Sequence, residues 1–504
     1  MNPSSSRLTG EARSDIQGFV TSGYGHLPVA AYLFLRVTDA AACRRWIGTR
    51  LDAIATSAPW PRDEGGRPIK PAVAINVAFT ADGLRACGLP ASVLCTFPLD
   101  FQEGIVSPAR SRILGDTEES APTAWELGGP NTERIHAIVI IHACDDAALD
   151  AACSAERSHI QRTNGGVIQW SGQDQRGYRP ATDAEPFGFK DGLEQPSIAG
   201  LSEDGVPTGE FILGYPNHYG VIPPTPLVPS ALDPQDLLPP FDNPYHGADR
   251  RHDLGRHGTF VVYRKLQQHV ALFWQALRDE AVRQRGVAEA GYMIWLASKM
   301  VGRWPSGVPL VQSPHRDDPE CPTNDDFGYR GDPNGLACPI GAHIRRARPR
   351  DDLKPYPAEQ SRHMSEAHRL LRRARVFGPP LFDSALLRDG ATPVNREALV
   401  SLEDDGQARG IHFFAVNASI RSQFEFVQQT WCNSPSVGGL SANKDPIAGD
   451  HARAGDVPTR MVIPRTDGPL RTGPLPRVVT VRGGAYLFMP GLTALRYLAA
   501  GSFA

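Results

Sequence analysis

The chain has 504 residues, with 52 Lys and Arg against 55 Asp and Glu, which gives a net charge of −3 at neutral pH. A chain with so balanced a charge is not expected to bind nucleic acid, because binding through phosphate contacts needs a strong basic excess. Its 41% hydrophobic and 21% charged residues are typical of a folded globular protein. No stretch approaches the ~18 continuous apolar residues of a membrane-spanning helix, so no membrane association is expected.

The cysteines and the first residues bear on the cellular compartment. The eight cysteines are scattered and include no CxxC or CxxCH sequence, which excludes the usual zinc-ribbon, thioredoxin and c-type haem motifs. Residues 1–19 contain no apolar signal core and no twin-arginine sequence. We therefore expect reduced cysteines and a cytoplasmic location.

The first 170 residues contain a recognisable order of elements. One helix is expected to begin after Asp39 and end near residue 55, and another to span about 145–161. Residues 80–134 are rich in turns and resemble an insertion. Strands are predicted at 28–37, 72–79, 136–142 and 166–170. The order β-α-β-β-α-β is that of the split βαβ, or ferredoxin-like, unit.

The second half repeats this order with larger insertions. Strands are predicted at 258–263, 411–416 and 484–490, and helices at about 265–285 and 419–431. We therefore predict an α+β fold with two ferredoxin-like halves. The expected boundaries are an N-terminal domain at 1–200, a Pro-rich loop or linker at 201–256, and a C-terminal domain at 257–504.

Three segments carry residues that are suited to chemistry, and each also has a simpler explanation. The first is GFKDG at 188–192. Asp-Gly flanked by glycine is most often only a turn. Alternatively, the glycines let the backbone approach a flat ligand and direct Asp191 into a cavity, where a carboxylate can transfer protons.

The second and third segments are CPIGAHIRRARPR at 338–350 and HRLLRRARVFG at 368–378. A lone histidine such as His343 is usually a hydrogen-bonded core or surface residue, although one buried imidazole is enough to hold a haem iron. The arginines that follow form either a solvated basic face or partners for haem propionates. An arginine in the third segment, if buried beside haem, would stabilise negative charge on a bound peroxide.

Together these segments resemble the dye-decolourising haem peroxidases. The resemblance extends from about residue 15 to residue 492 and includes further matches, namely DIQGF at 15–19, NVAFTADGL at 76–84, LGD at 114–116, MVGRWPSGVPL at 300–310 and QFEFVQQTW at 423–431. It implies two ferredoxin-like halves that form a dimeric α+β barrel-type sandwich around haem b. It leaves the oligomeric state open.

The resemblance implies a role for four polar residues. His343 would be the proximal ligand of the haem iron, and Asp445, in KDPIAG, would hold its other ring nitrogen. Asp191 would be the distal acid-base residue. Arg372, six residues before Gly378, would be the distal arginine that polarises the peroxide and contacts a propionate.

Further positions follow from the same resemblance. Arg350 would lie near a haem propionate, and Ile411 and Phe413 would line the distal pocket. This chain departs from the family pattern in two places. Residues 355–366 resemble an insertion, and Ala374 stands where several relatives place Ser or Asn.

The expected function is therefore that of a haem peroxidase. Hydrogen peroxide would oxidise organic donors such as dyes and phenolics in one-electron steps through an oxyferryl intermediate. The main alternative is a haem-handling protein on the same fold, either a carrier or a deferrochelatase-like protein. A catalytically silent module and a chlorite-dismutase-like enzyme are weaker alternatives, because the first does not need Asp191 and the second lacks it.

Overall fold

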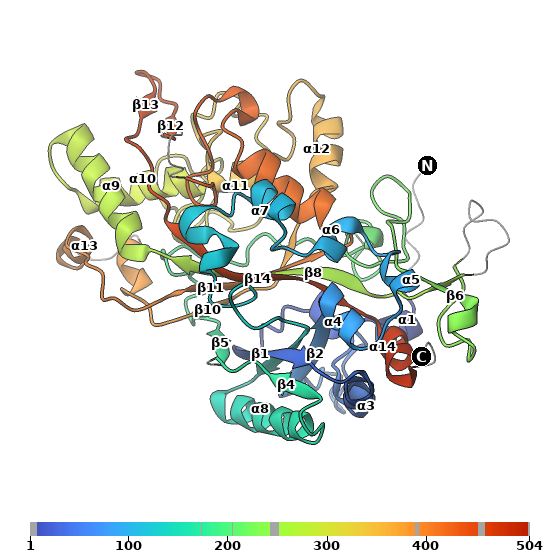
Figure 1. The fold of residues 1–504 in the computed structure, drawn as a ribbon. Coiled ribbons are helices and arrows are strands. Elements are labelled where there is room, and N and C mark those ends of the chain that lie inside the picture. Colours follow the sequence, from blue (N-terminus) through green and yellow to red (C-terminus); the bar gives the residue numbers. More distant parts are fainter. Residues whose placement is uncertain are drawn as a thin grey trace.

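One large antiparallel sheet organises the chain (Figure 1). The computed structural model describes residues 8–172, 174–203, 205–241, 251–388, 393–451 and 459–501. Within these residues the sheet has ten strands: β1 (Val29–Val37), β2 (Val73–Phe79), β3 (Ala137–Ala143), β4 (Val167–Gln169), β5 (Gln175–Tyr178), β8 (Thr259–Gln268), β9 (Leu371–Arg372), β10 (Arg375–Phe377), β11 (Gly410–Asn417) and β14 (Val479–Met489). The α+β class predicted from the sequence is confirmed.

The strand order is β10-β5-β1-β3-β2-β14-β8-β11-β9, and β4 pairs with β1. In each half the first long strand lies centrally, β1 between β5 and β3 and β8 between β14 and β11. This is the arrangement that two copies of a β-α-β-β-α-β unit would give. Because β10 also pairs with β11, the path of strands closes on itself.

The sheet is buried on both faces because its strands alternate between two cores. In β1, Tyr32 and Phe34 belong to one core, whereas Leu33 and Leu35 belong to the other. Helices α3 (Ala40–Arg50), α8 (Asp146–Gln161) and α14 (Leu492–Ala500) cover one side of the N-terminal half, at the bottom of Figure 1. None of the described helices combines the length and apolar character that crossing a membrane requires.

A third core lies with the helices of the C-terminal half, which stand above the sheet in Figure 1. These helices are α9 (Val270–Arg285), α10 (Ala290–Val301), α11 (His343–Ala347), α12 (Ala358–Glu366) and α13 (Pro393–Val400). The predicted start of α9 near residue 265 is wrong. β8 continues to Gln268, because its last residues pair with both β11 and β14. The predicted helix at 419–431 is present as two π-helical segments, Arg421–Glu425 and Val427–Cys432.

The connecting segments are more structured than expected. Short helices fill most of the turn-rich insertion: α4 (Ala81–Ala86), α5 (Ala91–Leu94), α6 (Leu99–Glu103) and α7 (Pro108–Leu114). Two more, α1 (Gly10–Asp15) and α2 (Gly18–Thr21), precede β1. In the Pro-rich segment, residue 204 and residues 242–250 lie outside the described residues. Elsewhere it forms the strand pair β6 (Leu227–Pro229) and β7 (Arg251–Asp253), and Phe211–Leu213 is fully buried. It is therefore not only a surface loop, and the predicted domain boundaries stay predictions.

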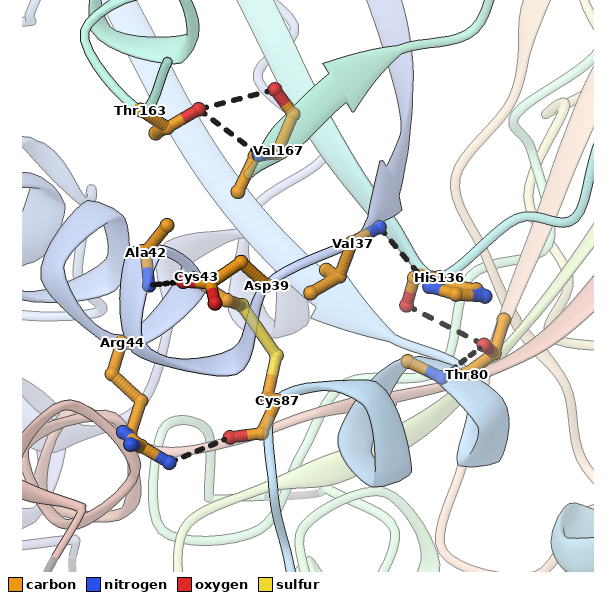
Figure 2. Close-up of a disulfide and its surroundings, with 11 residues drawn as sticks. Val37, Asp39, Ala42, Cys43, Arg44, Thr80, Cys87, His136, Thr163 and Val167 are labelled. Atoms are coloured by element: carbon orange, nitrogen blue, oxygen red, sulfur yellow. Dashed lines mark hydrogen bonds between the residues drawn. A yellow bond between two sulfur atoms is a disulfide. The ribbon is translucent and has the colours of Figure 1, made fainter. Parts of the chain in front are cut away.

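A disulfide joins α3 to the end of α4 (Figure 2). Cys43 and Cys87 are both buried, and their Cα atoms are 5.7 Å apart. The expectation of reduced cysteines is wrong for this pair. Its two cysteines are 44 residues apart in the sequence and form no short motif. Because disulfides are typical of oxidising compartments, the cysteines no longer support the expected cytoplasmic location, which stays a prediction.

Candidate functional site

A cavity of about 330 Å³ lies between the C-terminal half of the sheet and the helices above it. Its size is within the range of ordinary ligand-binding sites, about 300–1,000 Å³. Five of the seven predicted site residues line it: Asp191, His343, Arg372, Ile411 and Phe413. The other two, Arg350 and Asp445, are not part of its lining.

His343 and Asp445 form a hydrogen-bonded pair at the cavity wall. His343 is the first residue of α11, and its Nδ1 lies 2.9 Å from Oδ2 of Asp445, which is fully buried. Oδ1 of Asp445 accepts hydrogen bonds from the backbone N–H groups of Ile447 and Ala448. Burial alone would lower the pKa of His343, but the charge and hydrogen bond of Asp445 outweigh it and raise that pKa. Burial would likewise raise the pKa of Asp445, but His343 lowers it to about 2. Because Nδ1 of His343 is engaged by Asp445, Nε2 is the ring nitrogen left for a ligand in the cavity that His343 lines.

Asp191 and Arg372 meet in the same cavity. Nη1 of Arg372 lies 3.3 Å from Oδ1 of Asp191, and both side chains are about one-third exposed. The backbone N–H of Arg372 donates to Gln195 Oε1, which ties the arginine to the segment that follows Asp191. The adjacent Arg373 points elsewhere, because its guanidinium donates to the carbonyl groups of Phe19 and Val20.

The GFKDG segment is a turn and also carries a cavity residue. Oε1 of Glu185 accepts from the N–H of Phe189, and Oε2 accepts from the N–H of Phe187 and from Gln268 Nε2. Gly188 has a φ of +101° and leaves no room for a Cβ atom. Burial raises the pKa of Glu185 to about 7. Sequence reasoning missed Glu185, although its position two residues before Phe187 suits a side chain that caps the turn.

A network of arginines and carboxylates forms another part of the wall. Arg348 lines the cavity and pairs with Glu194 at 3.0 Å, Asp325 at 3.0 Å and Glu366 at 2.6 Å. Burial would raise the pKa of Glu194, but Arg350 and the neighbouring arginines lower it to about 2. Sequence reasoning did not find Arg348, Glu194 or Glu366, because the run of arginines gives no sign of which one faces inward.

Arg350 lies behind this wall. It is 4% exposed, its guanidinium stacks 3.9 Å from the ring centroid of Phe327, and it pairs with Glu194. Arg350 is therefore not part of the cavity lining, whereas Arg348 is, and the predicted contact of Arg350 with a propionate stays a prediction. Residues 355–366, expected as an insertion, include α12, whose last turn brings Ser365 and Glu366 to this region.

The remaining wall is apolar. On β11, Ile411 and Phe413 face the cavity, while His412 and Phe414 between and beyond them are buried in the sheet. This alternation follows from the two-residue period of a strand. Other apolar lining residues are Leu193, Leu370, Phe424, Val427, Ile447 and Val479.

These residues fit a haem. A haem needs an imidazole that is held from behind, apolar walls for the ring, and cations for its carboxylates. His343 with Asp445, the apolar lining and Arg348 with Arg372 supply these features. They come from segments far apart in the sequence, and the fold brings them to one cavity.

Comparisons with known proteins agree with this fold. A dye-decolorizing peroxidase in complex with 2,6-dimethoxyphenol superposes with a TM-score of 0.72 at 23% identity, covering 97% of this chain and 99% of that chain. A dye-decolorizing peroxidase with an engineered heme pocket superposes with a TM-score of 0.73 at the same identity and coverage. These likenesses establish the fold.

Sequence relatives extend the comparison. The dye-decolorizing peroxidase of Mycena epipterygia is 28% identical over 502 residues, covering 93% of this chain and 84% of the relative. The multifunctional dye peroxidase DyP2 of an Amycolatopsis strain is 33% identical over 258 residues, covering 48% of this chain and 49% of the relative. No protein-family model matches the chain. These sequence relatives are dye peroxidases by name. Over most of its length the chain is similar to members of the dye-decolorizing peroxidase family.

Proposed function

We propose that this protein is a haem b peroxidase that uses hydrogen peroxide to oxidise organic donors in one-electron steps. The observation that carries the proposal is the meeting of two pairs, His343–Asp445 and Asp191–Arg372, in one cavity. The His343–Asp445 pair is suited to holding a metal-containing cofactor, and the Asp191–Arg372 pair is suited to proton transfer beside that cofactor. Reduction of one peroxide to two waters takes up two electrons and two protons, so two donor molecules each lose one electron.

His343 would hold the haem through Nε2. Asp445 fixes the ring by accepting the Nδ1 proton, and its buried negative charge makes the imidazole a stronger donor. Arg348 and Arg372 line the cavity and would face the haem carboxylates. When bound, haem supplies the redox chemistry, and the protein controls position and protonation.

Asp191 would act as the acid-base residue. A carboxylate oxygen of Asp191 would accept the proton of the bound peroxide and return it to the oxygen atom that leaves as water. Arg372 orients this carboxylate at 3.3 Å and would stabilise the negative charge that develops when the O–O bond breaks. The clamped turn around Glu185 holds Asp191 in place for this transfer.

Phenols and dyes are the proposed donors. One related structure holds 2,6-dimethoxyphenol, and the sequence relatives are dye peroxidases by name. The apolar walls beside Ile411 and Phe413 are compatible with aromatic molecules near the cavity.

Oxidation of 2,6-dimethoxyphenol by the haem-loaded protein tests the proposal. Peroxide-dependent oxidation is expected in the native protein. Asp191→Asn is expected to lower kcat/KM by about 10²–10⁴-fold, the usual contribution of a positioned acid-base group. Asp52→Asn, a control at an exposed carboxylate outside the cavity lining, is expected to leave it unchanged.

The haem-handling alternative predicts a different outcome. A carrier would bind haem without peroxide-dependent oxidation, and a deferrochelatase-like protein would release iron and leave fluorescent free porphyrin. The Asp191–Arg372 pair favours the peroxidase, because neither alternative requires a polarised acid in the cavity. Either of these outcomes would contradict the proposal if the Asp191→Asn variant also gave the same result as the native protein.

A further inference from the structure

A fully buried arginine lies behind the His343–Asp445 pair. Arg346 follows His343 by three residues on α11, and its side chain is among the largest that are completely buried. Moving a guanidinium out of water is costly unless its N–H groups find acceptors. Neither the family resemblance nor the proposed chemistry gives this residue a role.

Three backbone carbonyl groups accept hydrogen bonds from the Arg346 guanidinium. Nη1 donates to the carbonyl of Trp431 at 2.6 Å and to that of Ser434 at 3.1 Å, and Nη2 donates to the carbonyl of Asn443. Trp431 lies at the end of the π-helical segment Val427–Cys432, where the last carbonyl groups of a helix lack partners within the helix. Arg346 supplies such a partner, and its positive charge is favourable at this negative end of the helix dipole.

The carbonyl groups that Arg346 holds belong to the segments that position Asp445. The N–H of Asp445 donates to the carbonyl of Cys432 at 2.9 Å, so its loop is tied to the end of the π-helical segment. Asn443 stands two residues before Asp445 in that loop. Arg346 joins both the loop and the π-helical segment to α11, the helix that begins with His343.

The charges of this region also act on one another. Burial lowers the pKa of Arg346, and the negative charge of Asp445 acts in the opposite direction. Burial would raise the pKa of Asp445, whereas His343 and, less strongly, Arg346 lower it. Arg346 therefore has two opposing effects on His343. As a cation it weakens the pull of Asp445 on the Nδ1 proton, and as a hydrogen-bond donor it keeps Asp445 in place to exert that pull.

We propose that Arg346 is a positioning residue, which holds Asp445 against Nδ1 of His343 and so sets how strongly His343 donates to the haem iron. The inference rests on the proposed function in one respect, that His343 binds the haem. A carboxylate at Nδ1 makes an imidazole a stronger donor, and a stronger donor stabilises ferric haem relative to ferrous haem. Arg346 thereby keeps the reduction potential of the haem low.

The neighbouring Arg345 provides a matched control. It is also buried on α11, but its guanidinium bonds to Asp332, to Asp352 and to the carbonyl of Cys338. These groups lie outside the loop and the π-helical segment that Arg346 holds. The same substitution at both positions therefore separates a specific effect on Asp445 from a general disturbance of α11.

The midpoint potential of the haem-loaded protein, measured by spectroelectrochemistry without peroxide, tests the proposal. Arg346→Lys keeps the positive charge, but an ammonium group lacks the planar fork with which the guanidinium reaches three carbonyl groups. We expect it to raise the potential and to lower the Fe–His stretching frequency of the ferrous protein in resonance Raman spectra. Both shifts should have the direction of those in Asp445→Asn and be smaller. Arg345→Lys should change neither quantity.

Arg346→Met separates position from charge. If Arg346 acted through its charge alone, Arg346→Met would lower the potential, because loss of a nearby cation favours ferric haem, and Arg346→Lys would leave it unchanged. We expect both variants to raise the potential, because both release the loop that carries Asp445. The rise should be smaller in Arg346→Met, where the lost charge acts in the opposite direction.

The double variant Arg346→Lys/Asp445→Asn shows whether the effect passes through Asp445. Substitutions that act through one shared contact are not additive. The double variant should therefore have the same potential as Asp445→Asn alone.

Four results would overturn the proposal. They are an unchanged potential in Arg346→Lys, a lowered potential in Arg346→Met, a further rise in the double variant over Asp445→Asn, or loss of haem binding in both Arg346 variants but not in Asp445→Asn. The last would show that Arg346 maintains the fold and not the position of Asp445. Failure of the proposed peroxidase would appear separately, as absence of peroxide-dependent oxidation in the native protein with the shifts in potential intact.

Discussion

Glu185 illustrates how one buried acid organises the residues around it. Its carboxylate receives three hydrogen bonds, from two backbone N–H groups of the turn and from Gln268 at the end of β8. These bonds add to two backbone hydrogen bonds that also hold the turn, from the N–H of Glu185 to the carbonyl of Phe189 and from the N–H of Gly188 to the carbonyl of Glu185. Asp191, six residues later, depends on that shape to face Arg372.

The raised pKa of Glu185 leads to a pH-dependent contribution to stability. The folded protein holds the proton up to about pH 7, whereas the unfolded chain releases it near the ordinary value of 4.5. The folded state thus binds the proton more tightly, so this contribution is complete below about pH 4.5 and is lost as the pH rises through about 7. The free energy of unfolding should fall by roughly 2–3 kcal/mol across this window relative to Glu185→Gln.

Denaturant unfolding of the native protein and of Glu185→Gln, at matched pH values and in the same haem state, measures this difference. Glu210, whose pKa burial also raises to about 7, is present in both proteins and cancels in the comparison. Parallel pH profiles for the two proteins would show that Glu185 does not titrate as described.

At the residue scale the sequence anticipated some of the contacts around the cavity and not others. The resemblance placed Asp445 behind His343, although the two lie 102 residues apart, and the structure brings them to 2.9 Å. It implied that Arg350 lies near a propionate, which stays a prediction, whereas the structure has Arg348 and not Arg350 in the cavity lining. Composition and spacing cannot distinguish two arginines separated by one residue, because the choice depends on tertiary packing.

At the scale of elements, the capping residues were the most reliable signals. Asp39 and Asp145 accept hydrogen bonds from the N–H groups of Ala42 and Ala148, as expected of residues that begin helices. The strands β5, β9 and β10 were missed because they have only two to four residues and show no periodicity. The boundary between β8 and α9 was misplaced because strand pairing on both sides of β8 outweighs local preference.

The disulfide between α3 and α4 should stabilise the N-terminal half. Cross-links of this kind typically contribute about 2–4 kcal/mol by restricting the unfolded chain. The double variant Cys43→Ala/Cys87→Ala should therefore lower the free energy of unfolding by about that amount. Denaturant unfolding measures the loss, and Cys95→Ala, at an exposed free cysteine, is the matched control.

Reductant provides a second comparison for the same element. It should destabilise the native protein to the level of the double variant and leave the double variant unchanged. A native protein that is indifferent to reductant would contradict the role assigned to the disulfide.

At the scale of the whole molecule, the site depends on the union of the two halves of the chain. Asp191 precedes β8, whereas His343, Arg372 and Asp445 follow it. The predicted order of elements anticipated two halves of similar strand order. It could not show that they join in one sheet, because the pairings β2–β14 and β5–β10 rest on short contacts between remote strands.

Because the site forms only when the two halves of the chain join, no single motif was sufficient to predict it. Each of the three segments has a simple structural explanation in isolation, as a turn, a lone histidine or a charged surface. Their chemistry becomes evident only where the fold places Asp191, His343 and Arg372 on one cavity. The ordered set of motifs carried that information, whereas composition and periodicity did not.

The absorbance spectrum of the haem-loaded protein, recorded before and after a stoichiometric addition of hydrogen peroxide, tests the central claim most directly. We predict a Soret band that His343→Ala weakens or shifts and that Asp191→Asn preserves. We also predict a peroxide-induced spectral change that Asp191→Asn slows. A Soret band unaffected by His343→Ala, or a peroxide response equally fast in Asp191→Asn, would contradict the account.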